Sequence, residues 1–266
     1  MAVFAWADLH GRLDIFKKGL KHLNPEDKIY FLGDAADRGP DGWEIIKMIL
    51  NDDRFVYIKG NHEDLLVKAI KSLGIKEAFD PDAINWNKNM DLWFYNGGEP
   101  TYSAMLIDKI PVEEKINIID KLDSLPFVAC YYNAKLQNVL LSHAGCDDCT
   151  TADSWDEEKF LWDRDHLMFY DVWTGESNEI IVHGHTPIEL MIEEQAHNIE
   201  WYSHLYKKES NLYDTKLIEP KFWKGTGAYW YGKNHKVNID TGATWNGHSV
   251  LLNLDTWEET IITVYT

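Results

Sequence analysis

The chain has 266 residues, of which 45% are hydrophobic, and a formal net charge of −18. This size allows one large core, and we expect a single domain over residues 1–266. The acidic balance excludes duplex nucleic acid as an expected partner, since that binding relies on basic residues that neutralise phosphates. The first residues have no basic leader, and no apolar run of about 18 residues occurs, so the sequence predicts a soluble protein that is neither exported nor bound to a membrane.

The chain contains three cysteines, Cys130, Cys146 and Cys149. They are too few for a disulfide framework, which favours a reducing compartment such as the cytoplasm.

Strands and helices alternate at the start of the chain. Strands are expected over 3–7, 28–32 and 55–58, and helices follow over 12–23, 43–50 and 63–73. This alternation predicts βαβ units with a largely parallel sheet. Polar residues cluster after each strand, and ligands bind outside the carboxyl ends of strands in such sheets. The clusters are therefore expected to meet in one crevice.

The middle of the chain, over 78–124, is expected to be mainly helical, and we assign no chemistry to it. Pro111 followed by two glutamates is typical of a helix start. Later apolar and β-branched runs indicate strands, which we expect to form a second, mixed sheet. These runs cover 127–132, 138–141, 179–182, 237–239, 249–254 and 260–264. The expected fold class is α/β, a two-sheet sandwich with flanking helices and an active site at the carboxyl ends of the strands.

Five short segments, each after an expected strand, carry carboxylate, amide and imidazole groups. The residues are Asp8 with His10, Asp34, Asn61, His143 and His185. Oxygen and imidazole ligands without thiolate suit Mn, Fe, Zn or Mg better than a cysteine-rich structural zinc site. One Asp-x-His pair is a weak signal, but five such segments in order predict a metal site. Bound metal ions would also let an acidic protein act on an anionic substrate.

The surrounding motifs are DLHG at 8–11, GDAADRG at 33–39, GNHE at 60–63, SHAG at 142–145 and GHTP at 184–187. Together they resemble the signature motifs of the serine/threonine phosphoprotein phosphatase branch of the calcineurin-like metallophosphoesterases. LWDR at 161–164 and IDTGA at 239–243 resemble the bacterial and bacteriophage lambda-type enzymes of this branch. The departures, Leu9, Ala35 and Ala36, concern packing positions.

The resemblance implies two divalent metal ions, with manganese expected and Fe, Zn, Mg or Ni as alternatives. The first ion would be held by Asp8, His10 and Asp34, and the second by Asp34, Asn61, His143 and His185. A carboxylate that bridges two cations offsets their repulsion, and the two ions can share a water as hydroxide, the nucleophile for in-line attack on phosphorus.

The same resemblance assigns groups to the substrate. Arg38, Arg164 and Asn61 would bind the phosphate, since planar guanidinium groups can contact two phosphoryl oxygens at once. His62 resembles the acid that protonates the leaving oxygen. Asp37 resembles the carboxylate that orients this imidazole.

These roles predict a metal-dependent phosphomonoester hydrolase. The first expectation is a serine/threonine protein phosphatase acting on a phosphorylated protein or peptide. The alternative is a hydrolase of symmetric dinucleoside tetraphosphates, or another nucleotide phosphatase, which uses the same motifs. A remote alternative is a catalytically silent binding module, but the expected ligands, phosphate-binding arginines and acid are all present in the sequence.

Other candidates are given less weight. His183 shares a strand face with His185, and we expect it to pack or to support the site instead of binding metal. Cys146 and Cys149 have the Cys-x-x-Cys spacing but lack a second pair. Asp240 is expected to be structural or to support the ligands.

A segment over 195–236 separates the last metal motif from IDTGA. It contains nine aromatic residues and seven lysines against four acidic residues. An aromatic, locally basic flap could bind a phosphopeptide or stack on a nucleobase. The other interpretation is a packed β excursion, and the sequence leaves both open.

Overall fold

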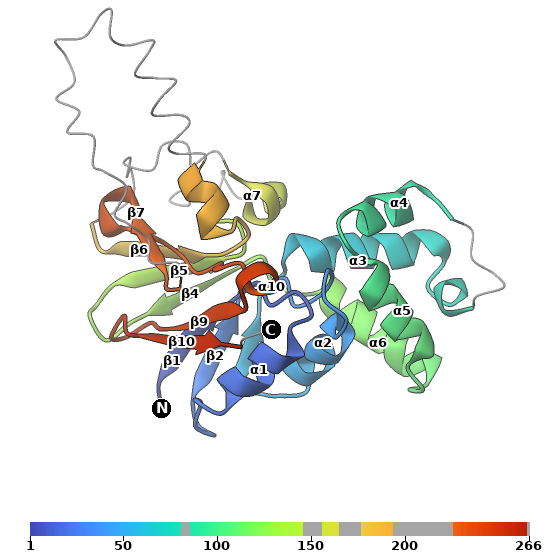
Figure 1. The fold of residues 1–266 in the computed structure, drawn as a ribbon, viewed down its shortest axis with the longest axis horizontal. Coiled ribbons are helices and arrows are strands. Elements are labelled where there is room, and N and C mark those ends of the chain that lie inside the picture. The colour runs from blue at the N-terminus through green and yellow to red at the C-terminus, as the bar shows by residue number, and fades with distance from the viewer. Residues whose placement is uncertain (81–85, 146–155, 165–176, 194–225, 265–266) are drawn as a thin grey trace, which may run out of the picture.

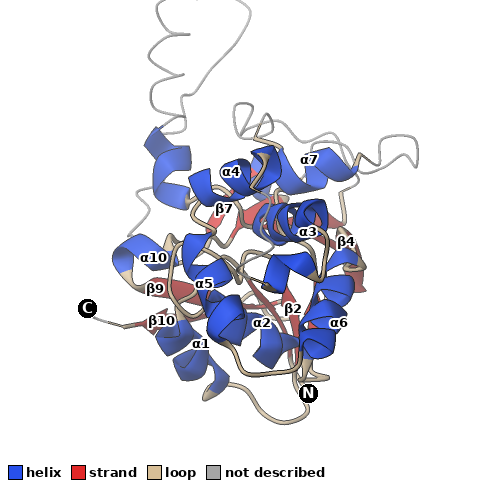
Figure 2. Ribbon diagram, turned by 90° about the vertical axis from the view of Figure 1, so that its right-hand side faces the viewer, coloured by secondary structure: helices blue, strands red, loops and turns tan. Residues whose placement is uncertain are grey.

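The computed structural model describes residues 1–80, 86–145, 156–164, 177–193 and 226–264. Two five-stranded sheets pack against each other, and helices cover the outer face of the first sheet (Figure 1). When the molecule is turned by 90°, these helices lie in front of the strands (Figure 2). The expected α/β two-sheet sandwich with flanking helices is therefore confirmed.

The first sheet has the strand order β10-β9-β1-β2-β3. Its parallel part is β1 (Val3–Trp6), β2 (Lys28–Phe31) and β3 (Phe55–Tyr57), as the alternation predicted. β9 (His248–Asn253) pairs antiparallel with β1, and β10 (Glu259–Thr263) pairs antiparallel with β9.

The expectation that the last two strands belong to the second sheet was wrong. β9 pairs with β1 on one edge and with β10 on the other. Its core is buried on both faces, because Leu251 packs in the core under the helices and Leu252 packs between the two sheets. Strand propensity predicts that a segment forms a strand, but packing between distant segments decides which strand it pairs with.

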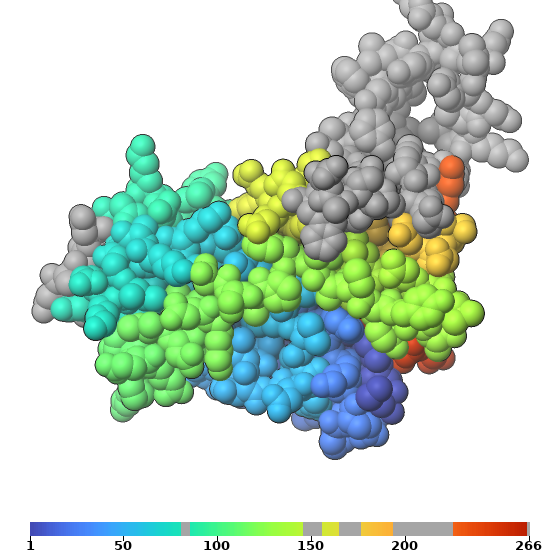
Figure 3. Space-filling view, turned by 180° about the vertical axis from the view of Figure 1, so that it is seen from behind, coloured from blue at the N-terminus to red at the C-terminus, as the bar shows by residue number. Residues whose placement is uncertain are grey.

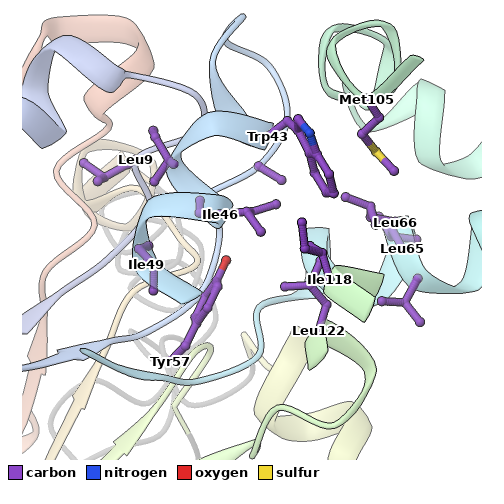
Figure 4. Close-up of a cluster of buried hydrophobic side chains, with 14 of the residues drawn as sticks. Leu9, Trp43, Ile46, Ile49, Tyr57, Leu65, Leu66, Met105, Ile118 and Leu122 are labelled. Carbon is purple, nitrogen blue, oxygen red and sulfur yellow. The ribbon is translucent and has the colours of Figure 1, made fainter. Parts of the chain in front are cut away.

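One helix follows each of the first three strands, and these helices carry the apolar face that covers the sheet. They are α1 (Leu13–Leu20), α2 (Gly42–Leu50) and α3 (Asn61–Leu73). Figure 4 shows the core beneath them, where Ile46 and Ile49 of α2 lie near Tyr57 of the sheet. This layer fixes the loops that leave β1, β2 and β3.

The middle of the chain is helical, as expected. After the short η1 (Glu77–Phe79), the helices are α4 (Lys88–Tyr95), α5 (Glu99–Ile107) and α6 (Val112–Asp123). α6 begins after Pro111. Met105 of α5 and Ile118 of α6 join the same core as α2 and α3 (Figure 4).

The second sheet has the order β4-β5-β6-β8-β7. Its strands are β4 (Val128–Tyr132), β5 (Asn138–Ser142), β6 (Glu179–His183), β7 (Tyr229–Tyr231) and β8 (Lys236–Asn238). α7 (Glu157–Trp162) packs on it through Phe160. Seen from behind, the green α6 and the yellow-green β4 and β5 form one continuous surface (Figure 3).

The end of the 195–236 segment belongs to this sheet. β7 was not expected, and it pairs antiparallel with β8; the short η3 (Gly232–Asn234) joins the two strands. The interpretation as a β excursion is therefore correct for residues 229–236, and residues 195–225 lie outside the described part of the chain.

A shared apolar core joins the two sheets. Val3 and Ala5 of β1 and Leu252 of β9 pack with Val139 of β5 and Val182 of β6. This packing brings the carboxyl ends of β1, β2, β5 and β6 to neighbouring positions. No helix in the described ranges is long and apolar enough to cross a membrane. The assignment of residues 1–266 to one domain stays a prediction.

Candidate active site

The five predicted segments meet at the carboxyl ends of the strands. Asp8 follows β1, Asp34 follows β2, Asn61 begins α3 after β3, and His143 follows β5. His185 follows β6 after one glycine. All five side chains are buried, although carboxylates and imidazoles normally prefer solvent. Their gathering in one place is what the sequence predicted.

The backbone at this place is held in an unfavourable conformation. Ten non-glycine residues in the described ranges have positive φ angles. Six of them are predicted site residues: Asp8, His10, Asp34, Asp37, Arg38 and His185. Such left-handed conformations persist where the surrounding structure imposes them, and they cluster at functional sites.

Four donor atoms form one cluster around Asn61. Its Oδ1 lies 2.8 Å from Nε2 of His143 and 3.0 Å from Nδ1 of His185. The two ring nitrogens are 3.2 Å apart. Oδ1 of Asp34 is 3.4 Å from Nε2 of His143. These are the four residues expected to hold the second metal.

The protonation of His143 explains why this cluster suits a cation. Its Nδ1 is 2.7 Å from the carbonyl oxygen of Leu32, so Nδ1 carries the proton and donates it there. Burial lowers the pKa of His143, so the ring is neutral and Nε2 presents a lone pair. This lone pair faces the oxygen of Asn61, another acceptor. Two acceptors at this distance repel each other unless a cation lies between them.

A second cluster shares Asp34. Its other oxygen, Oδ2, lies 3.4 Å from Nε2 of His10 and 3.8 Å from Nε2 of His62. Nδ1 of His10 donates to the carbonyl oxygen of Ala36 at 2.9 Å, which leaves Nε2 as an acceptor. The two oxygens of Asp34 thus face two different sets of imidazoles, as a bridging carboxylate requires.

Asp8, which was expected in the first metal site, belongs to neither three-residue cluster of the described residues. The backbone N–H of His185 is 3.1 Å from its Oδ1 and 3.2 Å from its Oδ2. Burial raises the pKa of Asp8 well above its usual value, and the nearby carboxylates of Asp240 and Asp34 raise it further. Three buried carboxylates so close together repel one another, and a bound cation would relieve this repulsion.

His62 and Asp37 form the expected pair. Nδ1 of His62 donates to Oδ2 of Asp37 at 2.8 Å, and both side chains are buried. Burial opposes protonation of His62, but the carboxylates of Asp34 and Asp37 outweigh it and raise the pKa of the ring. His62 begins α3 beside Asn61, so its Nε2 faces the same space as the metal-ligand candidates.

Two guanidinium groups lie at the mouth of the site. Nη1 of Arg38 donates to Nε2 of His10 at 2.9 Å, and its Nη2 lies 3.1 Å from Nε2 of His62. Arg164 donates from Nε to Nε2 of His185 at 3.3 Å. Both arginines remain exposed. Both guanidinium groups could therefore bind an anion that lies above the imidazoles.

Glu63 is a supporting residue that sequence reasoning missed. Its buried carboxylate accepts backbone N–H bonds from Asp34 at 2.7 Å, Ala35 at 3.0 Å and Gly60 at 3.0 Å. It therefore ties the loop after β2 to the start of α3. Its place in the GNHE motif was the available signal, but nothing in the sequence indicates that its partners are backbone groups.

The structure describes two of the candidates that were given less weight, His183 and Asp240. His183 contacts the hydroxyl of Tyr231 at 2.6 Å and lies in neither cluster of the described residues. Asp240 accepts from the backbone N–H of Gly242 at 2.9 Å, and burial raises its pKa to about 7. Cys130 is exposed, and Cys146 and Cys149 lie outside the described residues.

Comparison with known proteins agrees with this geometry. The family model for calcineurin-like phosphoesterases matches residues 1–230. The chain therefore belongs to the calcineurin-like phosphoesterase family.

Curated relatives fall into two groups. The symmetrical bis(5'-nucleosyl)-tetraphosphatase of Pseudomonas syringae pv. syringae is 32% identical over 111 residues, which cover 36% of this chain and 38% of that protein. The serine/threonine-protein phosphatase 2 of Escherichia coli is 26% identical over 129 residues, or 47% of this chain and 50% of that protein. The matched part thus spans at most half of the length of these relatives.

Solved structures support the fold. A serine/threonine phosphatase from Saccharomyces cerevisiae gives a TM-score of 0.56 at 12% identity, covering 100% of this chain and 81% of that one. A metallophosphoesterase from Sphaerobacter thermophilus gives 0.51 at 13% identity, covering 100% and 89%. At these identities the likeness concerns the fold alone.

Proposed function

We propose that the chain is a dinuclear metal-dependent hydrolase of phosphate monoesters. The observation that carries the proposal is the position of Asp34, whose two oxygens face two separate groups of imidazoles. His10, Asp34 and Asp8 would hold one ion, while Asp34, Asn61, His143 and His185 would hold the other. When bound, two such ions supply Lewis acidity, which lowers the pKa of a water toward neutrality and offsets phosphoryl charge.

The remaining side chains have roles in binding and proton transfer. Arg38 and Arg164 are exposed beside the imidazoles and would bind the phosphoryl oxygens, together with the side-chain N–H of Asn61. His62 would donate a proton from Nε2 to the oxygen that leaves phosphorus. Asp37 keeps the opposite nitrogen of that ring, Nδ1, in the protonated form.

For the substrate, we propose phosphoserine or phosphothreonine in a protein or peptide, and manganese as the metal. The motifs around the site and the match to the Escherichia coli protein phosphatase support this choice. The cysteine usage of the sequence favours a cytoplasmic location.

A second candidate is hydrolysis of a symmetric dinucleoside tetraphosphate. It is supported by two curated tetraphosphatases, each 32% identical to parts of this chain. Both candidates use the same reaction centre, so the difference between them lies in what binds beyond the phosphate.

A product assay with manganese separates the candidates. A phosphothreonine peptide and diadenosine tetraphosphate are incubated in parallel with the protein, and released phosphate and ADP are measured. We expect faster release of phosphate from the peptide. Faster release of ADP would instead favour the second candidate, and no product from either, or from aryl phosphates, would exclude phosphoesterase activity and leave the silent binding module.

A further inference from the structure

The helical layer contacts the proposed acid pair through one buried side chain. Trp93 of α4 is fully buried, and its indole N–H donates to Oδ2 of Asp37 at 2.9 Å. This is the same oxygen that accepts the proton of Nδ1 of His62 at 2.8 Å. The other oxygen of Asp37 has no hydrogen-bond partner among the described residues. The carboxylate is therefore held by two donors on a single oxygen.

The turn between α4 and α5 and the first part of α5 hold the backbone at the same place. The backbone N–H of Asp37 donates to Oγ1 of Thr101 at 2.8 Å, and that of Arg38 donates to the carbonyl oxygen of Gly97 at 2.9 Å. Asp37 and Arg38 both have positive φ angles, 69° and 62°. These contacts stabilise two adjacent non-glycine residues in a conformation that is normally unfavourable.

The indole itself is fixed in place by close packing. A side chain at Gly98 would collide with the indole ring near Nε1, so only glycine allows the approach of this turn. Phe94 and Tyr102 pack edge-on against the ring, at centroid distances of 5.8 Å and 5.9 Å. A rigid donor of this kind holds its acceptor in one orientation.

We propose that Trp93 is a positioning residue for the acid step, acting through Asp37 on His62. This rests on the proposed function. In that step, water adds to phosphorus, the P–O bond to the leaving group breaks, and the proton on Nε2 of His62 moves to the leaving oxygen. The direction of Nε2 depends on the ring angle, which the Asp37 carboxylate sets, and Trp93 fixes that carboxylate.

The chain contains a matched control for the loss of an indole–carboxylate bond. Trp43 of α2 is also buried, and its indole N–H donates to Oδ2 of Asp108 at 2.8 Å. Asp108 pairs with Lys47 at 2.6 Å, away from the candidate site. Trp43→Phe and Trp93→Phe therefore remove the same donor and the same volume, but only Trp93→Phe affects the acid pair.

The test is the dependence of rate on the leaving group, measured with manganese for the wild type and both variants. For phenyl phosphate, a poor leaving group, Trp93→Phe is expected to lower kcat about 10- to 100-fold, the range for loss of a group that orients a functional side chain. For 2,4-dinitrophenyl phosphate, which needs little protonation, kcat is expected to change about twofold at most. KM is expected to stay constant. Trp43→Phe is expected to keep the wild-type ratio of kcat for 2,4-dinitrophenyl phosphate to kcat for phenyl phosphate. An unchanged ratio in Trp93→Phe, or an equal change in Trp43→Phe, would overturn the proposal.

Two further measurements keep the proposal testable. The first is the chemical shift of the low-field proton NMR signal of Nδ1–H of His62, which does not depend on hydrolysis of the ester. This chemical shift is expected to change in Trp93→Phe and to stay the same in Trp43→Phe. An unchanged chemical shift in Trp93→Phe contradicts the proposal. If Trp93→Phe does not fold, benzothienylalanine at position 93 keeps the ring shape and removes only the N–H. If the wild type hydrolyses neither ester, the proposed function fails, and the NMR signal alone decides the role of Trp93.

Discussion

The two groups of donor atoms on either side of Asp34 differ in what they contact. Around Asn61, the oxygen and two ring nitrogens face one another within 3.2 Å. Around His10, the free ring nitrogen instead accepts from Arg38 at 2.9 Å. The candidate ligand atoms around Asn61 thus face one another as they would around a bound cation. In the His10 group, the ring nitrogen that could bind a cation is already hydrogen-bonded to a guanidinium.

This difference indicates how binding and catalysis are divided. Arg164 lies at Nε2 of His185, the nitrogen opposite the Nδ1 that faces Asn61, so its guanidinium does not occupy the position of a metal there. Arg38 and a metal would compete for one lone pair on His10. We therefore expect the Asn61 group to bind manganese more tightly than the His10 group.

The largest effect should follow from removing the shared carboxylate. Asp34→Ala is expected to abolish binding of both ions and to lower kcat/KM by at least about 10⁴-fold, because both groups lose a ligand at once. Metal content by mass spectrometry and aryl phosphatase assays check this. Asp53→Ala, at an exposed carboxylate, serves as the control. Two tightly bound ions in Asp34→Ala would contradict the bridge.

His62 lies close enough to Asp34 and His10 to be a third metal ligand in the His10 group. The acid role predicts instead that His62→Ala keeps two metal ions and lowers kcat about 10²- to 10⁴-fold. Metal analysis and steady-state kinetics on the same sample distinguish the roles. Loss of one ion together with activity would assign His62 to metal binding.

Removal of Arg38 should lower the activity more than removal of Arg164. Arg38 reaches both His10 and His62, whereas Arg164 contacts only His185 among the described partners. We expect Arg38→Ala to lower kcat/KM for an aryl phosphate about 10- to 100-fold, as for loss of a charge-assisted hydrogen bond, and Arg164→Ala to have a smaller effect. Arg54→Ala, an arginine paired with Asp52, is the control. A larger effect for Arg164 would reverse this order.

The smallest effect concerns pH. Burial lowers the pKa of His10, His143 and His185, so these imidazoles take up a proton only at a lower pH than free histidine does. Because protons compete with metal for the ring nitrogens, the two histidines of the Asn61 group would, with ordinary pKa values, lose roughly 14-fold in affinity for their ion from about pH 7.5 to about pH 6.0. With the lowered pKa values, calorimetry of this ion is expected to show a loss below about fivefold. A steeper loss would show that these rings titrate normally.

The sequence predicted much of this arrangement because the ligand candidates lie at strand ends. A residue such as Asp34 can be placed from a short apolar run followed by Gly-Asp, since the chain itself dictates where β2 ends. The helix start at Pro111 was also predictable, because proline is suited to the first turn of a helix.

Contacts between distant segments could not be predicted in this way. The pairing of β9 with β1 joins segments that are far apart in the chain, and their apolar residues fit either sheet. Trp93 was assigned no chemistry, because one tryptophan in a helix does not reveal that its N–H meets Asp37. Glu63 was overlooked for a similar reason, since its partners are backbone groups.

The most direct test of the bridged metal pair is anomalous diffraction from crystals soaked in manganese. We expect two peaks about 3.5 to 4 Å apart, one on each side of Asp34, with the stronger among Asn61, His143 and His185. A single peak, or a pair of peaks in which Asp34 contacts neither ion, would contradict the account.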